Sequence, residues 1–61
     1  MPVVIVKMIS GRTEEQKREL AKEITEVVCR VGKTAPEQVD VVIEEYERGN
    51  WAKAGVLFSD K

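Results

Sequence analysis

The sequence predicts a small α/β protein (α+β by some schemes), a single βαβ unit with a parallel two-stranded sheet and a C-terminal hairpin or arm. Two apolar runs of strand length, residues 2–9 and 39–46, flank a capped amphipathic pattern of helix length. A crossover through a helix this long returns the second strand parallel to the first. With 61 residues and no linker or repeat, the chain is expected to form one domain, residues 1–61.

Residues 2–9, PVVIVKMI, are expected to form a strand that is covered on both faces. Alternation places Pro2, Val4, Val6 and Met8 on one face and Val3, Ile5, Lys7 and Ile9 on the other. Both sets are mostly apolar, which is typical of a sheet buried on two sides. Because one helix can cover only one face, a second copy of the chain is expected to cover the other.

The helix is expected over residues 14–31. Thr13 and Gln16 have the spacing of a capping box, in which each side chain bonds the other residue's backbone amide. Apolar residues then recur at spacings of three and four and predict one buried stripe: Leu20, Ala21, Ile24, Val27, Val28 and Val31. Gly32 is expected to end the helix in a left-handed conformation. Cys29 lies about 145° from the centre of the stripe, which predicts a solvent-facing or interface thiol.

The second half of the chain predicts a short capped turn, a second strand and an irregular arm. The turn is expected at residues 34–37, and the strand at 39–46 with Val39, Val41 and Ile43 on one face. Residues 47–61 contain Arg48-Gly49-Asn50, Trp51 and Gly55. They predict a turn followed by short extended pieces, and in a protein this small such an arm often pairs with a neighbouring subunit.

Composition argues against several classes of protein. Ten basic and eleven acidic residues leave a net charge of -1, so nucleic acid and anionic membrane surfaces are not expected partners. The chain has no histidine and only Cys29, so neither a metal site, an internal disulfide nor a nucleophile with its base is expected. No glycine spacing fits a phosphate loop, and no cofactor is expected.

The length of the apolar run bears on the expected location, and the length of the chain bears on the expected assembly. The apolar run at the start is interrupted at Lys7, far short of the roughly 20 residues of a membrane span. A cytoplasmic protein with one free thiol is expected. A chain this short buries only about 60% of its unfolded surface, so oligomerisation is expected to complete the core.

Two residues could carry chemistry, Pro2 behind the initiator methionine and Arg12 before the helix. Each also has a purely structural interpretation. Proline is tolerated at the first residue of a strand, and an arginine before a helix can be a surface charge. The residues alone leave both interpretations open.

The whole chain resembles the 4-oxalocrotonate tautomerase (2-hydroxymuconate tautomerase) family of short βαβ proteins, whose mature chains begin with a catalytic proline. The most specific match is the junction Gly-Arg-Thr-x-x-Gln-Lys at residues 11–17, at this distance from Met1-Pro2. Further matches are Val42-Ile43-Glu44-Glu45 in the second strand and Gly49-Asn50-Trp51 with Gly55 near the end.

The resemblance implies a tautomerase that needs no cofactor. Once Met1 is removed, Pro2 would be a secondary amine, whose pKa is lowered by apolar surroundings and a nearby cation. It would then act as the general base that interconverts enol and keto forms of an unsaturated 2-oxo acid, such as 2-hydroxymuconate or an arylenolpyruvate.

The resemblance also implies roles for three further residues and an assembly. Arg12 would bind the substrate carboxylate and polarise its carbonyl oxygen, since the planar guanidinium suits bidentate contact. Trp51 would form the apolar wall of the site, and the same ring could also anchor a subunit interface. A backbone amide near Ile9 would contact the small-molecule carboxylate substrate. The expected assembly is a homo-oligomer, a hexamer built as a trimer of dimers, with sites across subunit boundaries.

One departure from the family leaves alternatives open. The family's second arginine aligns with Asp40, whose charge would repel a dianionic substrate and, if close, favour protonated Pro2. A monocarboxylate such as an arylenolpyruvate is therefore a candidate substrate. A second reaction is hydration or dehalogenation of 3-substituted acrylates, with Asp40, Glu44 or Glu45 activating water. A third possibility is an assembly module without activity.

Overall fold

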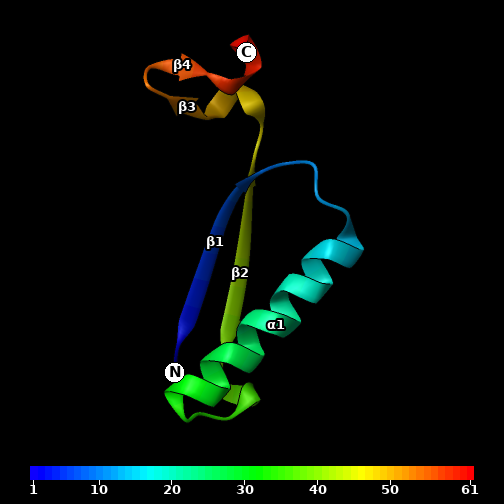
Figure 1. Ribbon diagram of the computed structural model, residues 1–61, viewed down its shortest axis with the longest axis vertical. Coiled ribbons are helices and arrows are strands. Elements are labelled where there is room, and N and C mark those ends of the chain that lie inside the picture. Colours follow the sequence, from blue (N-terminus) through cyan, green and yellow to red (C-terminus); the bar gives the residue numbers. More distant parts are fainter.

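The computed structural model describes residues 1–61 and has the predicted βαβ order. Strand β1 (Val3–Ile9) leads into α1 (Glu14–Gly32), and β2 (Asp40–Tyr46) returns parallel to β1 (Figure 1). A short 3-10 helix, η1 (Pro36–Gln38), precedes β2. In the register Val3 lies opposite Asp40 and Ile9 opposite Tyr46. The predicted fold class and parallel pairing are confirmed.

The capping box at the start of α1 is present in full. The Gln16 amide donates to Thr13 Oγ1 at 3.1 Å, and the Thr13 amide donates to Gln16 Oε1 at 2.9 Å. At the other end the expected stop at Gly32 is wrong by one residue. Gly32 is still helical, and Lys33 adopts the left-handed conformation, φ 56°, with its amide donating to the Cys29 carbonyl.

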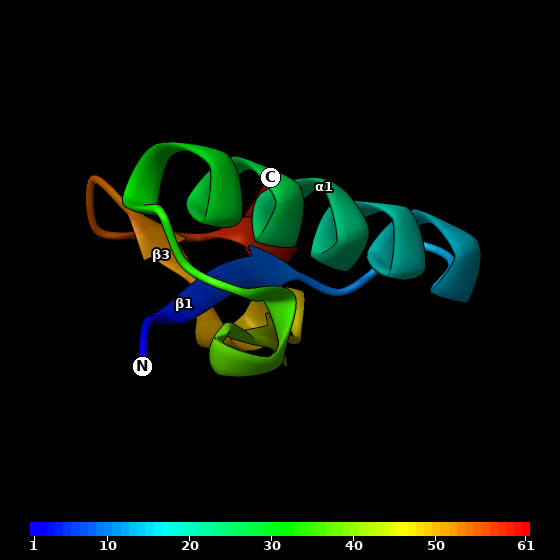
Figure 2. The same cartoon turned by 90° about the horizontal axis from the view of Figure 1, so that it is seen from below.

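Helix α1 covers one face of the sheet and leaves the other open (Figure 2). Val4, Val6 and Met8 are half-buried on the covered face. On the open face Val3 and Ile5 keep 56% and 54% of their surface exposed. The alternation predicted for residues 2–9 is therefore confirmed, and one apolar face has no cover within the chain.

The covered stripe of α1 is rotated from the predicted one. Val27 and Val31 remain 47% and 70% exposed, whereas Thr25 and Cys29 are half-buried. Thr25 can occupy this position because its hydroxyl donates to the Ala21 carbonyl at 2.8 Å, so its polar group is satisfied. Cys29 is thus more covered than expected. No helix of the structure has the length and apolar character of a membrane span.

The single chain is too open to be a complete folded unit. None of its residues is buried, and the accessible surface is 4720 Å², against about 4000 Å² for a folded monomer of this mass. The radius of gyration is 14.5 Å, against about 10.5 Å for a compact domain of this length. Hydrophobic residues that would normally form a core therefore lie at the surface.

The arm after β2 is a small hairpin with two 3-10 turns. It consists of η2 (Arg48–Asn50), β3 (Ala52–Lys53), β4 (Val56–Leu57) and η3 (Phe58–Asp60), and it lies beyond the end of the main sheet (Figure 1). Ala54 and Gly55 have φ of 54° and 80°, as the two central residues of a type I′ turn require. The predicted turn and short extended pieces are confirmed.

Three aromatic rings connect the arm to the sheet. The Tyr46 and Trp51 ring centroids are 5.9 Å apart at 62°, and those of Trp51 and Phe58 are 6.4 Å apart. The Tyr46 hydroxyl donates to Glu44 Oε1 at 2.8 Å. This hydrogen bond, with desolvation and the Glu44 charge, raises the pKa of Tyr46 above its usual 10.0.

Replacing Thr13 with Ala should lower the free energy of unfolding by about 1 kcal/mol, because the Gln16 amide loses its acceptor. Urea unfolding at one fixed protein concentration measures this change. Glu19→Ala, at an exposed helix position outside the capping box, is the control and should have little effect. An equal effect of the two substitutions would contradict the role of the cap.

Tyr46 is the only tyrosine, so an ultraviolet titration reports it alone. Its midpoint should lie above 10.0. Because the folded-state pKa is raised, its stabilisation is present below the unfolded pKa and is lost as pH rises through the folded value. Glu44→Gln should move the midpoint back toward 10.0. An unchanged midpoint in this variant would rule out Glu44 as the cause.

Candidate active site

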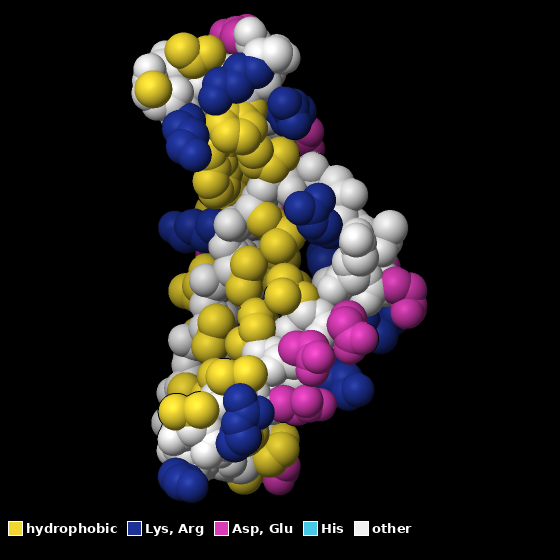
Figure 3. All heavy atoms as spheres, viewed as in Figure 1, with side chains coloured by type: hydrophobic (Ala, Val, Ile, Leu, Met, Phe, Trp, Pro, Cys, Tyr) yellow, Lys and Arg dark blue, Asp and Glu magenta, His cyan; other side chains and the backbone are white.

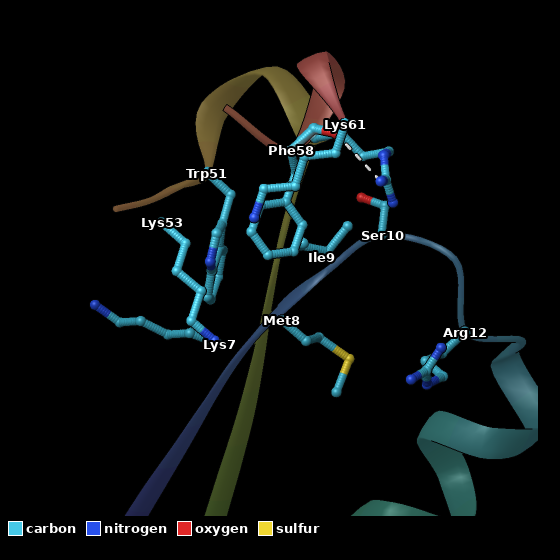
Figure 4. A pocket seen from close by; sticks show the side chains of 10 residues that line it. Lys7, Met8, Ile9, Ser10, Arg12, Trp51, Lys53, Phe58 and Lys61 are labelled. Atoms are coloured by element: carbon cyan, nitrogen blue, oxygen red, sulfur yellow. Dashed lines mark hydrogen bonds between the residues drawn. The ribbon is translucent and has the colours of Figure 1, made fainter. Parts of the chain in front are cut away.

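A cavity of about 670 Å³ opens where β1 ends and the arm begins. This volume is within the range of small-molecule sites. Among its lining residues are three that the sequence predicted, Ile9, Arg12 and Trp51 (Figure 4). The full lining is Lys7, Met8, Ile9, Ser10, Arg12, Arg48, Trp51, Lys53, Phe58 and Lys61.

The apolar side of the cavity is formed by rings and by the end of β1. Trp51 and Phe58 are half-buried, and the Phe58 amide donates to the Trp51 carbonyl at 2.8 Å. Met8 and Ile9 come from β1 and face the same space (Figure 4). Phe58 was not predicted, because its role depends on the hairpin that folds residues 52–57 back toward Trp51.

The charged side chains around the cavity are all basic, and Ser10 is the remaining polar one. No Asp or Glu side chain lines the cavity, and five cationic side chains do: Lys7, Arg12, Arg48, Lys53 and Lys61. None of these five forms an ion pair, since the salt bridges of the chain join Lys17 to Glu45 and Arg18 to Glu14 and Glu15. Dark blue side chains surround the apolar patch on the arm in Figure 3. The cavity is therefore suited to an anion with an apolar body.

Arg12 is held between the end of β1 and the start of α1. Gly11 before it has φ 139°, a backbone conformation that residues with side chains rarely adopt. The Thr13 cap after it fixes the beginning of the helix. Arg12 itself is exposed and makes no hydrogen bond or ion pair with the rest of the chain, so its guanidinium donors are available to a ligand.

Pro2 lies at the opposite end of β1 from this cavity. Its carbonyl accepts from the Asp40 amide at 3.0 Å, at the first pair of the sheet. Pro2 is seven residue steps from Ile9 along the strand, at about 3.3 Å per step, which is a distance of roughly 23 Å. One chain therefore does not bring Pro2 together with Arg12 and Trp51.

The three carboxylates considered from the sequence have different surroundings. Asp40 is exposed beside the Pro2 end of the sheet and forms no ion pair. Glu44 accepts from the Tyr46 hydroxyl, and Glu45 pairs with Lys17 at 2.8 Å. None of them lines the cavity. No group of three or more His, Cys, Asp or Glu residues is placed to hold a metal ion.

Comparisons with known proteins agree with this architecture. Residues 2–61 match the family model described as tautomerase enzyme. A 2-hydroxymuconate tautomerase of Bacillus subtilis is 45% identical over 60 residues, covering 98% of this chain and 97% of the relative. A probable tautomerase of Halalkalibacterium halodurans is 41% identical over 61 residues, covering 100% of both chains.

Solved structures give the same result for the fold. A 4-oxalocrotonate tautomerase homologue superposes with a TM-score of 0.95 at 44% identity, covering 100% of this chain and 97% of its own. A heterohexamer 4-oxalocrotonate tautomerase from Chloroflexus aurantiacus superposes with a TM-score of 0.93 at 25% identity, covering 98% and 97%. The resemblance inferred from the Met-Pro start and the Arg12 junction is confirmed, and the chain belongs to the tautomerase family of isomerases.

Proposed function

We propose that this tautomerase interconverts the enol and keto forms of unsaturated 2-oxo acids, with Pro2 as the general base once Met1 has been removed. The observation that carries the proposal is the cavity that unites Ile9, Arg12 and Trp51 without any carboxylate. Its apolar rings suit a conjugated substrate, and its cations suit the carboxylate and the developing dienolate. No cofactor is required.

Arg12 is the residue proposed to bind the substrate carboxylate and carbonyl oxygen. Its guanidinium has no competing carboxylate in the chain, so its donors are available for bidentate contact. The main-chain amide near Ile9 is proposed as a further donor to the substrate. Trp51 supplies the apolar wall that excludes water and strengthens these charge interactions.

Pro2 is the residue proposed to move the proton. The family match begins at residue 2, and the relative from Bacillus subtilis is named for 2-hydroxymuconate. After Met1 is removed, Pro2 becomes a secondary amine, which can take a proton from the enol hydroxyl and return it to carbon along the conjugated chain. While Met1 remains, the same nitrogen is an amide and has no basicity.

The proposed assembly is a homo-oligomer, and we expect a hexamer built as a trimer of dimers. The open apolar face of the sheet and the large radius of gyration support an assembly. It also supplies the proposed site, since Pro2 of one chain would meet Arg12 and Trp51 of another. A structural relative is described as a heterohexamer, and a cytoplasmic location fits the single free thiol.

The alternative reactions have less support from the structure. Hydration of an acrylate needs a carboxylate to activate water, but Glu44 and Glu45 are engaged by Tyr46 and Lys17. Asp40 is free but lies outside the cavity. An inactive assembly module gives no reason for a cavity lined by unpaired cations. We therefore retain the tautomerase reaction as the proposal.

Pro2→Ala should reduce ketonisation of 2-hydroxymuconate or phenylenolpyruvate by about 10²- to 10⁴-fold, the usual contribution of a general base. Stopped-flow or steady-state absorbance of the enol measures the rate. Intact mass should show that Met1 is absent from the active wild-type protein. Undiminished activity of a preparation that retains Met1 would contradict the proposal.

The assembly makes a separate prediction for the open face. Ile5→Lys places a charge on that face and should produce a monomer with strongly reduced helix content, because an unpaired buried charge opposes association. Sedimentation and circular dichroism measure the two effects. Glu23→Lys, at an exposed helix position, is the control and should leave the oligomer intact. A stable, helical Ile5→Lys oligomer would contradict the use of this face.

A further inference from the structure

Two cationic side chains, Arg48 and Lys61, lie near the Phe58 ring of the arm and have no role in the proposed reaction. Arg48 Cζ lies 5.8 Å from the Phe58 ring centroid, and Lys61 Nζ lies 4.4 Å from it. The two charges are therefore at most roughly 10 Å apart, about one Debye length at moderate ionic strength. Both residues line the cavity that also contains Arg12.

These two cations lack a counter-charge within the chain. Neither forms an ion pair, although Asp60 is adjacent in sequence to Lys61. Two like charges held near one ring repel each other, and an anion placed between them would remove that repulsion. Cation–π contact alone stabilises an exposed cation by only a small amount.

The geometry of Arg48 is suited to receiving an anion. Its Nη2 donates to the Phe58 carbonyl at 3.2 Å, which fixes the guanidinium plane and leaves its other donors free. Arg12 approaches the cavity from the start of α1 (Figure 4), whereas Arg48 lies in η2 of the arm and lines the same cavity. A ligand with acid groups at both ends could therefore contact one cation at each end.

We propose that Arg48 and Lys61, supported by the Phe58 ring, form a second anion subsite that binds the distal carboxylate of a dicarboxylate substrate. This inference rests on the proposed function for the role of Arg12. The subsite would supply the positive charge that the family's second arginine provides. Asp40, which aligns with that arginine, lies at the Pro2 end of the sheet and outside the cavity. The arm would thus determine whether the enzyme prefers dianions.

The test compares two ligands that share a six-carbon diene chain, trans,trans-muconate with two carboxylates and sorbate with one. Calorimetry on the processed, assembled protein gives both dissociation constants. Wild type should prefer muconate by about tenfold, the usual contribution of one charge-assisted hydrogen bond. Arg48→Gln and Lys61→Gln should each reduce this preference severalfold. Arg12→Gln should weaken the binding of both ligands.

Matched controls are available on α1. Arg30→Gln and Lys22→Gln remove the same charges at exposed helix positions and should leave the preference unchanged. Arg48→Lys keeps the positive charge and should retain most of the preference for muconate. Because the readout is a ratio within one variant, a general loss of folding or assembly weakens both ligands and cancels.

Several results would overturn the subsite. These are a wild-type preference near one, no binding of either ligand, or a preference that Arg48→Gln leaves unchanged. Equal weakening of both ligands by Arg48→Gln leaves the preference unchanged and therefore also counts against the subsite. Failure of the proposed function is distinguishable, because a protein that turns over no enol acid but keeps the preference retains the subsite.

Discussion

One apolar face of the two-stranded sheet is not covered within the chain, and this constraint governs the rest of the structure. A two-stranded sheet with a single helix covers only one of its faces, and the other exposes Val3, Ile5 and Val42. No residue of the isolated chain is buried, so the hydrophobic contribution that normally offsets chain entropy is incomplete. In the proposed assembly, this part of the core is formed between copies of the chain. Folding stability and association would then be a single equilibrium.

The same constraint determines how the proposed site is divided. The strand β1 separates Pro2 at its beginning from Ile9 at its end, and Arg12 and Trp51 lie with Ile9 around the basic cavity. A rigid strand cannot fold back to join its own ends, so the proposed base and the proposed anion binder must come from different chains. Aromatic contacts from Tyr46 through Trp51 to Phe58 then hold the arm where it completes the cavity.

Two features that depend on residues close together in the sequence were predicted correctly. Thr13 and Gln16 form the expected capping box, and the alternation from Val3 to Ile9 gave the correct faces. The helix stop was misplaced because Lys33, a residue with a side chain, adopts the left-handed conformation. Phe58, Arg48 and Lys61 could not be assigned to the cavity beforehand, because only the hairpin brings the end of the chain back to Trp51. Asp40 lies at the Pro2 end of the sheet and does not line the cavity, so its effect on the substrate stays a prediction.

Mixing two inactive variants tests the division of the site most directly. Pro2→Ala and Arg12→Ala proteins, unfolded together in equal amounts and refolded, should recover about a quarter of wild-type activity, because random assembly gives that fraction of sites with both residues intact. Pro2→Ala mixed with the Pro2→Ala, Arg12→Ala double variant should recover none. Absence of activity in the first mixture, with normal mixed oligomers present, would show that Pro2 and Arg12 act within one chain and would contradict the account.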